Sequence, residues 1–163
     1  MVSELLHGLA PIVGKQPRLL ILGNMPSVMS LAAGQYYGNP RNAFWRITAE
    51  VFGFDAAAPY DERVCALVQH GIAVWDVLRS CRRVGSLDSA VEPDSMVPND
   101  FGSFFDDHRD IARVLFNGAA AETNYRRLVG VDTSPPSVRL PSTSPAHTMA
   151  YADKLLAWRA ALL

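Results

Sequence analysis

The sequence is poor in the features that mark secreted and membrane proteins. It contains only two cysteines, Cys65 and Cys81, which are too few for a disulfide scaffold or a zinc site. No apolar run approaches the roughly 18 residues that a membrane span needs. The segment Met1–Leu9 includes Glu4 and no basic cluster, so it does not read as a signal peptide. We therefore expect a cytoplasmic protein that has no membrane partner.

The chain also lacks a strong charge of either sign. Lysine and arginine together number 15 and acidic residues number 16, which gives a net charge of −1. This balance argues against a protein that covers nucleic acid with a wholly basic surface. The charge is uneven, because residues 88–110 hold seven acids and one arginine, whereas residues 1–50 and 111–163 each carry a basic excess. Such a chain has either an ordinary mixed surface or a positive face for a polyanion.

The size and composition indicate one domain with a substantial core. The 163 residues are 49% apolar and 19% charged, so we expect no disorder and assign residues 1–163 to a single domain. Short apolar runs alternate with amphipathic stretches. The runs predict strands at residues 18–22, 72–75, 111–116 and 138–140, and the amphipathic stretches predict helices at residues 42–52, 61–69, 119–128 and 150–162, with a further helix beginning at Asn99.

This alternation predicts an α/β fold, a compact three-layer α/β/α sandwich with a four-stranded parallel sheet. In such sheets, ligands bind beyond the carboxyl ends of the strands. The informative segments are therefore those that follow each predicted strand, at residues 23–42, 76–88, 117–118 and 141–148.

The segment Gln35–Trp45 is unusual because it is long and carries four aromatic side chains among its amides. Long loops tend to be functional or disordered, and the aromatics argue against disorder. Aromatic faces beside amides suit a pocket for a planar heterocycle that is stacked on one side and hydrogen-bonded at its edge. Core packing is an equal alternative for Phe44 and Trp45, and Asn42 could serve only as a helix N-cap.

Polar and basic residues follow the other strands. Asp76 could accept a hydrogen bond from a ligand N–H, or it could cap a turn. The arginines of Arg79–Arg83 either bind phosphates or lie in a solvated loop. The small hydroxyl residues of Leu140–Ala146 could bring backbone N–H groups close to a phosphate, although a merely rigid loop would have the same composition. The turn Gly23–Ser27 lacks the Gly-Lys-Ser/Thr of a phosphate loop.

Together these segments resemble one enzyme family. The sequence YYGNPRNAFW at residues 36–45 is the most specific part, and it is accompanied by GNMPS at 23–27, WDVL at 75–78, GSLD at 85–88, FNG at 116–118 and LPSTSPA at 140–146. The set is similar to the DNA-deoxyinosine (hypoxanthine-DNA) glycosylases, the sixth family of the uracil-DNA glycosylase superfamily, over roughly residues 16–160. The resemblance implies a four-stranded parallel sheet with flanking helices and no metal or organic cofactor. It also implies hydrolysis of the bond between a deaminated base and deoxyribose in DNA.

The resemblance also assigns the catalytic group. The chain has Met25 where the wider superfamily carries Asp or Asn, and Leu140 where related enzymes carry His. Met25 cannot orient water, and Leu140 cannot stabilise a departing oxyanion. The sixth family shares both departures, and the asparagine that it is thought to use corresponds to Asn42. The resemblance therefore implies that Asn42 positions the attacking water, with Asn39 as the alternative.

The edge of hypoxanthine suggests how the base is recognised. Hypoxanthine offers a ring N–H donor and a carbonyl acceptor, so we infer that Asp76 accepts from the ring and that Asn117 donates to the carbonyl. Adenine would leave polar groups unpaired in the same pocket. Further base contacts are expected from Tyr36, Tyr37, Phe44 and Met25, and contacts to the DNA backbone from Ser27, Arg82, Arg83, Pro141, Ser142, Thr143 and Ser144.

We therefore expect a monomeric, monofunctional glycosylase that acts on hypoxanthine in DNA during base excision repair. Two alternatives stay open on the sequence. One is an enzyme of the same fold whose main substrate is uracil or another deaminated base, and the other is a damage-binding relative with weak catalysis. Lys15 and Lys154 lie outside the candidate loops, so a lyase step through a Schiff base is not expected.

Overall fold

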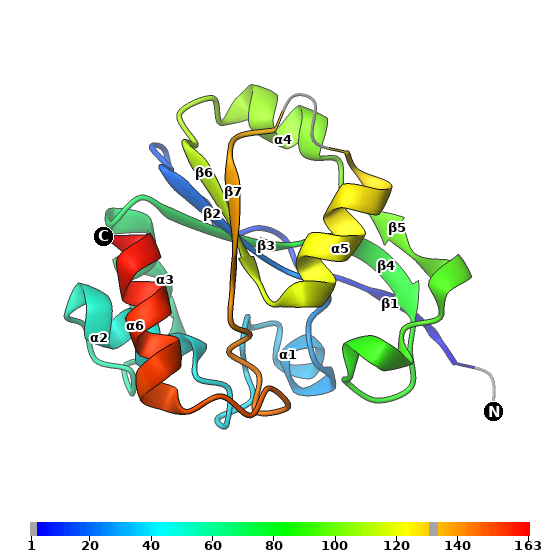
Figure 1. Cartoon of the computed structure of the whole chain (residues 1–163), viewed down its shortest axis with the longest axis horizontal. Helices are drawn as coiled ribbons and strands as arrows, with labels where there is room; N and C mark the ends of the chain where they lie inside the picture. The colour runs from blue at the N-terminus through cyan, green and yellow to red at the C-terminus, as the bar shows by residue number, and fades with distance from the viewer. Residues whose placement is uncertain (1–2, 131–133) are drawn as a thin grey trace.

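The computed structural model describes residues 3–130 and 134–163, and it contains the predicted parallel sheet (Figure 1). The four strands are β2 (Leu19–Gly23), β3 (Ile72–Asp76), β6 (Arg113–Asn117) and β7 (Ser137–Leu140), in the spatial order β3-β2-β6-β7. All three pairs are parallel, and each strand lies within two residues of its predicted bounds. The predicted sheet is therefore confirmed.

Both faces of the sheet are buried along β2, β3 and the middle of β6, which explains why these strands are largely apolar, whereas three of the four residues of the edge strand β7 are exposed. Along β2, Leu19 and Ile21 belong to one hydrophobic core, whereas Leu20 and Leu22 belong to the other. This alternation follows from the two-residue period of a strand. The sheet therefore needs a layer of helices on each side.

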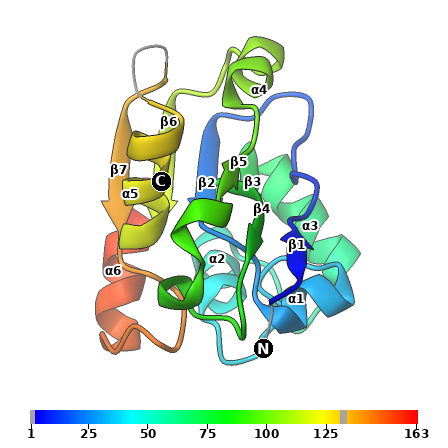
Figure 2. The ribbon, with the colours of Figure 1, turned by 90° about the vertical axis from the view of Figure 1, so that its right-hand side faces the viewer.

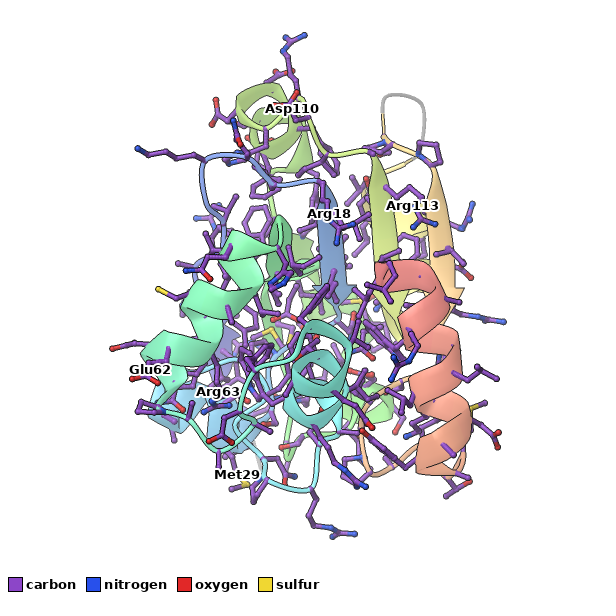
Figure 3. The ribbon with its side chains drawn as sticks, turned by 90° about the vertical axis from the view of Figure 1, so that its left-hand side faces the viewer. Arg18, Met29, Glu62, Arg63, Asp110 and Arg113 are labelled. Carbon is purple, nitrogen blue, oxygen red and sulfur yellow. The ribbon has the colours of Figure 1, made fainter. Side chains whose placement is uncertain are left out.

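The helices supply these two layers. Three helices, α2 (Phe44–Phe52), α3 (Tyr60–Gln69) and α6 (Tyr151–Leu162), cover the face that is turned toward the viewer in Figure 3. The opposite face is covered by α4 (Phe101–Asp107) and α5 (Ala119–Leu128). The predicted three-layer sandwich is thus confirmed. No helix within the described residues is long and apolar enough to span a membrane.

A second, antiparallel sheet lies beside the first and was not predicted (Figure 2). It consists of β1 (Leu5–His7), β4 (Leu78–Arg82) and β5 (Val97–Pro98), in the order β1-β4-β5. Two short 3₁₀ turns, η1 (Asp88–Ala90) and η2 (Pro93–Ser95), lie between β4 and β5. One of them brings an acidic residue to the candidate site.

Most of the arginine-rich segment Arg79–Arg83 therefore lies in strand β4 and not in a solvated loop. Leu78 is fully buried, and the exposed Arg82 donates from Nη1 to the Ser3 carbonyl oxygen at 2.8 Å. Arg83 is only 4% exposed, and its Nη2 donates to the Pro26 carbonyl oxygen at 2.7 Å. The Arg83 guanidinium is enclosed by the protein and lies outside the pocket, which counts against the predicted contact with a DNA phosphate, although its Nε and Nη1 have no partner within the described chain.

Two helices begin two residues later than predicted, α2 at Phe44 and α4 at Phe101. In each case a side chain before the helix accepts a hydrogen bond from a backbone N–H of the first turn. Asn42 Oδ1 accepts from Phe44 N at 3.0 Å, and Asp100 Oδ1 accepts from Ser103 N at 3.0 Å. Asn42 therefore does stabilise the start of α2.

The carboxyl edge of the parallel sheet is lined by loops that are distant in the sequence. A short helix, α1 (Val28–Ala33), follows β2 there, and the Ser27 hydroxyl oxygen caps it by accepting from Ser30 N at 3.1 Å. Beyond it, residues 34–43 run beside residues 141–149 at the lower edge of Figure 1. Ala43 N donates to the Thr143 carbonyl oxygen at 2.9 Å and ties the two loops together.

Candidate active site

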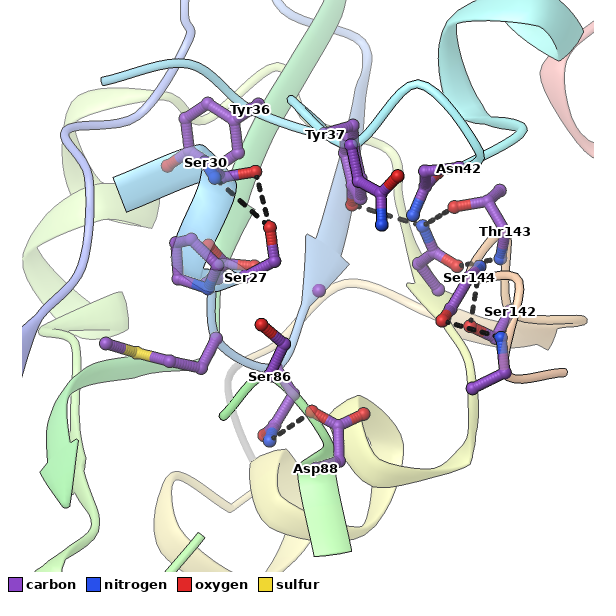
Figure 4. Close-up of a pocket in the computed structure, with 18 of the residues that line it drawn as sticks. Ser27, Ser30, Tyr36, Tyr37, Asn42, Ser86, Asp88, Ser142, Thr143 and Ser144 are labelled. Atoms are coloured by element: carbon purple, nitrogen blue, oxygen red, sulfur yellow. Dashed lines mark hydrogen bonds between the residues drawn. The ribbon is translucent and has the colours of Figure 1, made fainter. Parts of the chain in front are cut away.

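A pocket of about 220 Å³ opens at the carboxyl edge of the parallel sheet, where the segments after β2, β3, β6 and β7 meet (Figure 4). This is the position predicted for a ligand site. The pocket brings together eleven of the residues singled out from the sequence: Met25, Ser27, Tyr36, Tyr37, Asn39, Asn42, Asp76, Asn117, Ser142, Thr143 and Ser144.

Four other residues singled out from the sequence lie outside the pocket: Phe44, Arg82, Arg83 and Pro141. Phe44 is fully buried and stacks on Tyr37, with ring centroids 4.1 Å apart and planes inclined by 13°. It therefore supports the Tyr37 ring and does not contact a base, which corrects the prediction for Phe44. The Pro141 carbonyl oxygen accepts from the indole N–H of Trp158 at 2.9 Å, so Pro141 ties the loop that follows β7 to α6.

The Tyr37 ring forms one wall of the pocket and sits on a strained backbone. Its φ of 53° lies in the left-handed region, and no other non-glycine residue among residues 3–130 and 134–163 has a positive φ. The Tyr37 hydroxyl oxygen accepts from Asn117 Nδ2 at 3.1 Å, which leaves the phenolic proton available to donate. Burial raises the pKa of Tyr37, so the phenol stays neutral. The pocket thus holds a fixed, uncharged hydrogen-bond donor.

Gly23 allows Asp76 and Tyr37 to approach the end of β2 closely. A Cβ atom on Gly23 would lie 2.4 Å from Asp76 Oδ1 and 3.2 Å from the Tyr37 hydroxyl oxygen. Only glycine leaves room for both groups at this point. Tyr36, in contrast, presents only its ring to the pocket, because its hydroxyl donates to the Ala10 carbonyl oxygen at 3.0 Å.

Asn117 joins two walls of the pocket and has no hydrogen left for a base. Its Nδ2 donates to the Tyr37 hydroxyl at 3.1 Å and to Thr143 Oγ1 at 3.0 Å, while its Oδ1 accepts from Thr143 N at 2.9 Å. Both amide hydrogens are therefore used, which corrects the prediction that Asn117 donates to the base carbonyl. Thr143 is 1% exposed, and its backbone N–H and hydroxyl oxygen are both bonded to Asn117, which leaves little surface for the predicted contact with a DNA phosphate.

Two carboxyl groups face the pocket, and no basic side chain of the described residues lines it. Asp76 is 4% exposed, and its Oδ2 has no hydrogen-bond partner within the described chain. Burial, reinforced by the charge of Asp88, raises the pKa of Asp76 to about 7. Burial also raises the pKa of Asp88, and the guanidinium of Arg83 opposes both shifts. A buried acceptor without a partner is uncommon in folded proteins and marks Asp76 as a candidate ligand contact.

A chain of side-chain amides holds Asp88 at the pocket. Asn124 Nδ2, from α5, donates to Asn24 Oδ1 at 2.8 Å, and Asn24 Nδ2 donates to Asp88 Oδ1 at 3.1 Å, the bond drawn at Asp88 in Figure 4. Sequence reasoning missed this group. The GSLD pattern was its only signal, because the link from α5 through Asn24 to the η1 turn exists only in three dimensions.

Asn42 and Asn39 both line the pocket, and each uses its side-chain oxygen in a local turn. Asn42 Oδ1 accepts from Phe44 N, and Asn39 Oδ1 accepts from Arg41 N, both at 3.0 Å. Each oxygen keeps a second lone pair, and neither side-chain nitrogen has a partner within the described residues. Either side chain can therefore hold a water molecule as well as stabilise its turn.

A buried lysine that the sequence placed outside the site shapes the last loop. Lys154 of α6 is 4% exposed, and its Nζ donates to the carbonyl oxygens of Ser144 and His147 at 3.2 and 2.8 Å. Burial lowers the pKa of Lys154. Within the loop, Ser142 Oγ accepts from Ser144 N at 3.2 Å. These bonds fix the curvature of the pocket wall that Ser142 and Ser144 form.

Comparisons with known proteins find relatives along nearly the whole chain. The family model of the uracil DNA glycosylase superfamily matches residues 11–162. A hypoxanthine DNA glycosylase of Methanosarcina acetivorans is 30% identical over 155 residues, which cover 94% of this chain and 96% of that protein. A hypoxanthine DNA glycosylase of Methanosarcina barkeri is 34% identical over 113 residues, or 69% and 70% of the two chains. A solution NMR structure of a candidate uracil DNA glycosylase from Methanosarcina acetivorans has a TM-score of 0.84 and 29% identity, covering 98% of this chain and 97% of that one.

Proposed function

Because the chain belongs to the uracil DNA glycosylase superfamily, we propose that it is a monofunctional DNA glycosylase that releases hypoxanthine from deoxyinosine in DNA. Two relatives named hypoxanthine DNA glycosylase support this substrate, and one of them covers nearly the whole chain. The products would be the free base and an abasic site, which base excision repair then processes. The proposal includes the monomeric state and cytoplasmic location expected from the sequence.

The observation that carries this proposal is the meeting of an unpartnered carboxyl and an available phenol in the pocket. The Asp76 carboxyl accepts the ring N–H of hypoxanthine, and the Tyr37 hydroxyl donates to its carbonyl oxygen. Tyr37 thereby takes the donor role that the sequence suggested for Asn117. Adenine would turn an amino donor and a ring lone pair toward these groups, and each polar mismatch costs roughly 1–3 kcal/mol.

Water is held by Asn42, which lines the same pocket and keeps a lone pair and its side-chain N–H groups without a partner in the described residues. An amide is a poor general base, but little basicity is needed because the glycosidic bond is largely broken before water attacks. What the amide supplies is position, by holding water beneath the anomeric carbon. Asn39 has the same hydrogen-bonding pattern and is the alternative.

The charge of the pocket favours the cleavage step. Glycosidic cleavage passes through an oxocarbenium-like state in which the sugar becomes positive and the leaving base becomes negative. The carboxyls of Asp76 and Asp88 line the pocket without a basic neighbour among its described lining residues. The negative charge of Asp88 stabilises a positive sugar, whereas Asp76 is engaged with the base. The Tyr37 hydroxyl stabilises the departing base by donating to its carbonyl oxygen.

A panel of single-lesion duplexes tests the substrate. Deoxyinosine, deoxyuridine or deoxyadenosine is placed at the same position, and base release is followed in EDTA with enzyme in excess. We expect the fastest base release from deoxyinosine and no release of adenine. Because the enzyme is proposed to be monofunctional, we also expect no strand cleavage before alkali treatment and no covalent adduct trapped by borohydride. Faster release of uracil would instead support the uracil alternative, and binding without release of any base would support a damage-binding relative.

A further inference from the structure

A second pocket adjoins the first and carries the opposite charge. Its volume is about 330 Å³, and Tyr37, Asn39 and Asn42 line both pockets. Arg46 and Arg63 line the second pocket, and no acidic side chain of the described residues does. The first pocket has the reverse pattern of acidic groups without basic ones. Neighbouring pockets of opposite charge suit a ligand whose parts differ in charge, such as a nucleotide within a strand.

The Arg63 guanidinium is fixed in place by the protein itself. Its Cζ lies 4.7 Å from the centroid of the Trp45 ring and 5.5 Å from that of the Tyr60 ring. Its Nε donates to the Ala58 carbonyl oxygen at 2.9 Å. Burial lowers the pKa of Arg63, and no ion pair among the described residues involves it. A cation held partly out of water without an anionic partner is stabilised by a ligand anion.

Arg46 completes the basic lining from α2. Its Cζ lies 3.6 Å from the centroid of the Tyr151 ring, and it too has no ion-pair partner in the part of the chain that is described. A planar guanidinium offers two parallel N–H groups that match two oxygens of a phosphate. Arg63 lies toward the same carboxyl edge as the first pocket (Figure 3).

We propose that Arg46 and Arg63 form a subsite, beside the shared wall of Asn39 and Asn42, for a backbone phosphodiester of the DNA strand whose flipped nucleotide occupies the first pocket. The identity of that strand rests on the proposed function. A strand that places the sugar of its flipped nucleotide near Asn39 and Asn42 must carry its backbone past the same wall. The carboxyls of the first pocket repel phosphates, so the backbone needs cations beside the pocket and not inside it.

The salt dependence of DNA binding tests this subsite. Arg46→Met and Arg63→Met remove the charge and keep an aliphatic side chain, and affinity for an undamaged duplex is measured from about 50 to about 200 mM salt. Each variant is expected to weaken binding at every sequence and to reduce the salt slope by about 0.9. The control Arg109→Met makes the same charge change at an exposed site near α4 and should keep the wild-type slope. Wild-type slopes in both test variants would overturn the proposal.

Removing the charge of single phosphates in the DNA tests the same contact by changing the ligand instead of the protein. Methylphosphonate linkages are placed one at a time around a deoxyinosine, and one position is expected to weaken the wild type several-fold without further weakening Arg63→Met. Arg63→Lys keeps the positive charge but changes the packing on Trp45. Comparing it with Arg63→Met therefore separates the effect of losing the charge from the effect of losing this packing. Equal effects of every linkage on the wild type and Arg63→Met would overturn the subsite. Binding to undamaged DNA needs no base release, so failure of the proposed function would be seen separately, as absence of hypoxanthine.

Discussion

Asp76 combines three properties at one residue: burial, a carboxyl oxygen without a partner and a position in the pocket. Burial and the charge of Asp88 raise the pKa of Asp76 to about 7, so the side chain changes protonation state in the neutral range. The ionised carboxylate can only accept, as the ring N–H of hypoxanthine requires. The protonated form carries an O–H that would match the ring nitrogen of adenine instead. Protonation of Asp76 therefore controls which base edge fits.

We expect the rate on deoxyinosine to rise with pH up to about 7 and to level off above it, because only ionised Asp76 is purely an acceptor. In the Asp76→Asn variant the rate should no longer rise with pH, and at pH 8 it should be lower than the wild-type rate by about tenfold or more. Single-turnover rates from pH 5 to pH 9 check the prediction. A step that persists unchanged in Asp76→Asn would assign the titration to another group, with Asp88 the first to examine.

Asn42 has a structural and a proposed catalytic role, and substitutions separate them. Asn42→Ala should slow single-turnover cleavage of deoxyinosine by about 10²-fold. It should also cost about 1 kcal/mol of unfolding free energy, because Phe44 N loses its acceptor. Asn42→Asp keeps the acceptor and should melt like the wild type while its rate depends on pH. If Asn42→Ala melts lower but cleaves at the wild-type rate, Asn42 is only a cap and Asn39 becomes the residue to substitute.

At the scale of elements, α6 controls the last loop through Lys154. Lys154→Met leaves the His147 carbonyl without its donor and the Ser144 carbonyl with only the His147 N–H, which should lower the unfolding free energy by about 1–3 kcal/mol. The loop that forms one pocket wall should loosen, and affinity for DNA should fall. The control is Lys15→Met, the same substitution at an exposed lysine. Thermal melts and binding assays compare the two, and equal effects of both variants would contradict a role for Lys154 in the loop.

Three strands of the parallel sheet, β2, β3 and β6, were predictable because they are largely apolar runs that end at Gly23, Asp76 and Asn117. The second sheet was missed although β4 alternates buried and exposed positions, with Leu78 and Ser80 inside and Arg79 outside. The arginines drew attention as a basic cluster, and the strand pattern beneath them was overlooked. Charge density alone is thus a poor guide to which arginines reach a ligand.

The site was predictable in its position and in its residues, but its hydrogen bonds were not. The rule that ligands bind at the carboxyl edge of a parallel sheet places the segments after the strands together. Whether a side chain there still has a free donor depends on its neighbours in space. Asn117 has none because Tyr37 and Thr143 take its amide groups, and Asp76 is unpartnered because no donor reaches its Oδ2 within the described chain.

For the molecule as a whole, the buried carboxyl lowers stability at the pH where the pocket is expected to work. The pKa of Asp76 is raised in the folded state, so the native protein binds more protons than the unfolded chain between about pH 4 and 7. Stability should therefore fall as pH rises through this window, by a few kcal/mol at about 1.4 kcal/mol per unit. Denaturant unfolding at pH 5 and pH 8 should show the slope in the wild type and in the control Asp94→Asn, whose carboxyl is exposed. An equally steep fall in Asp76→Asn would contradict this assignment.

Detection of the free base tests the assignment of the pocket most directly. The wild-type chain is incubated with a duplex that carries one deoxyinosine, and the small-molecule fraction and the strand are both analysed by mass spectrometry. We predict free hypoxanthine and an uncut strand with one abasic site, and no product from the matching deoxyadenosine duplex. An unchanged deoxyinosine strand, or release of adenine at a similar rate, would contradict the roles given to Asp76 and Tyr37.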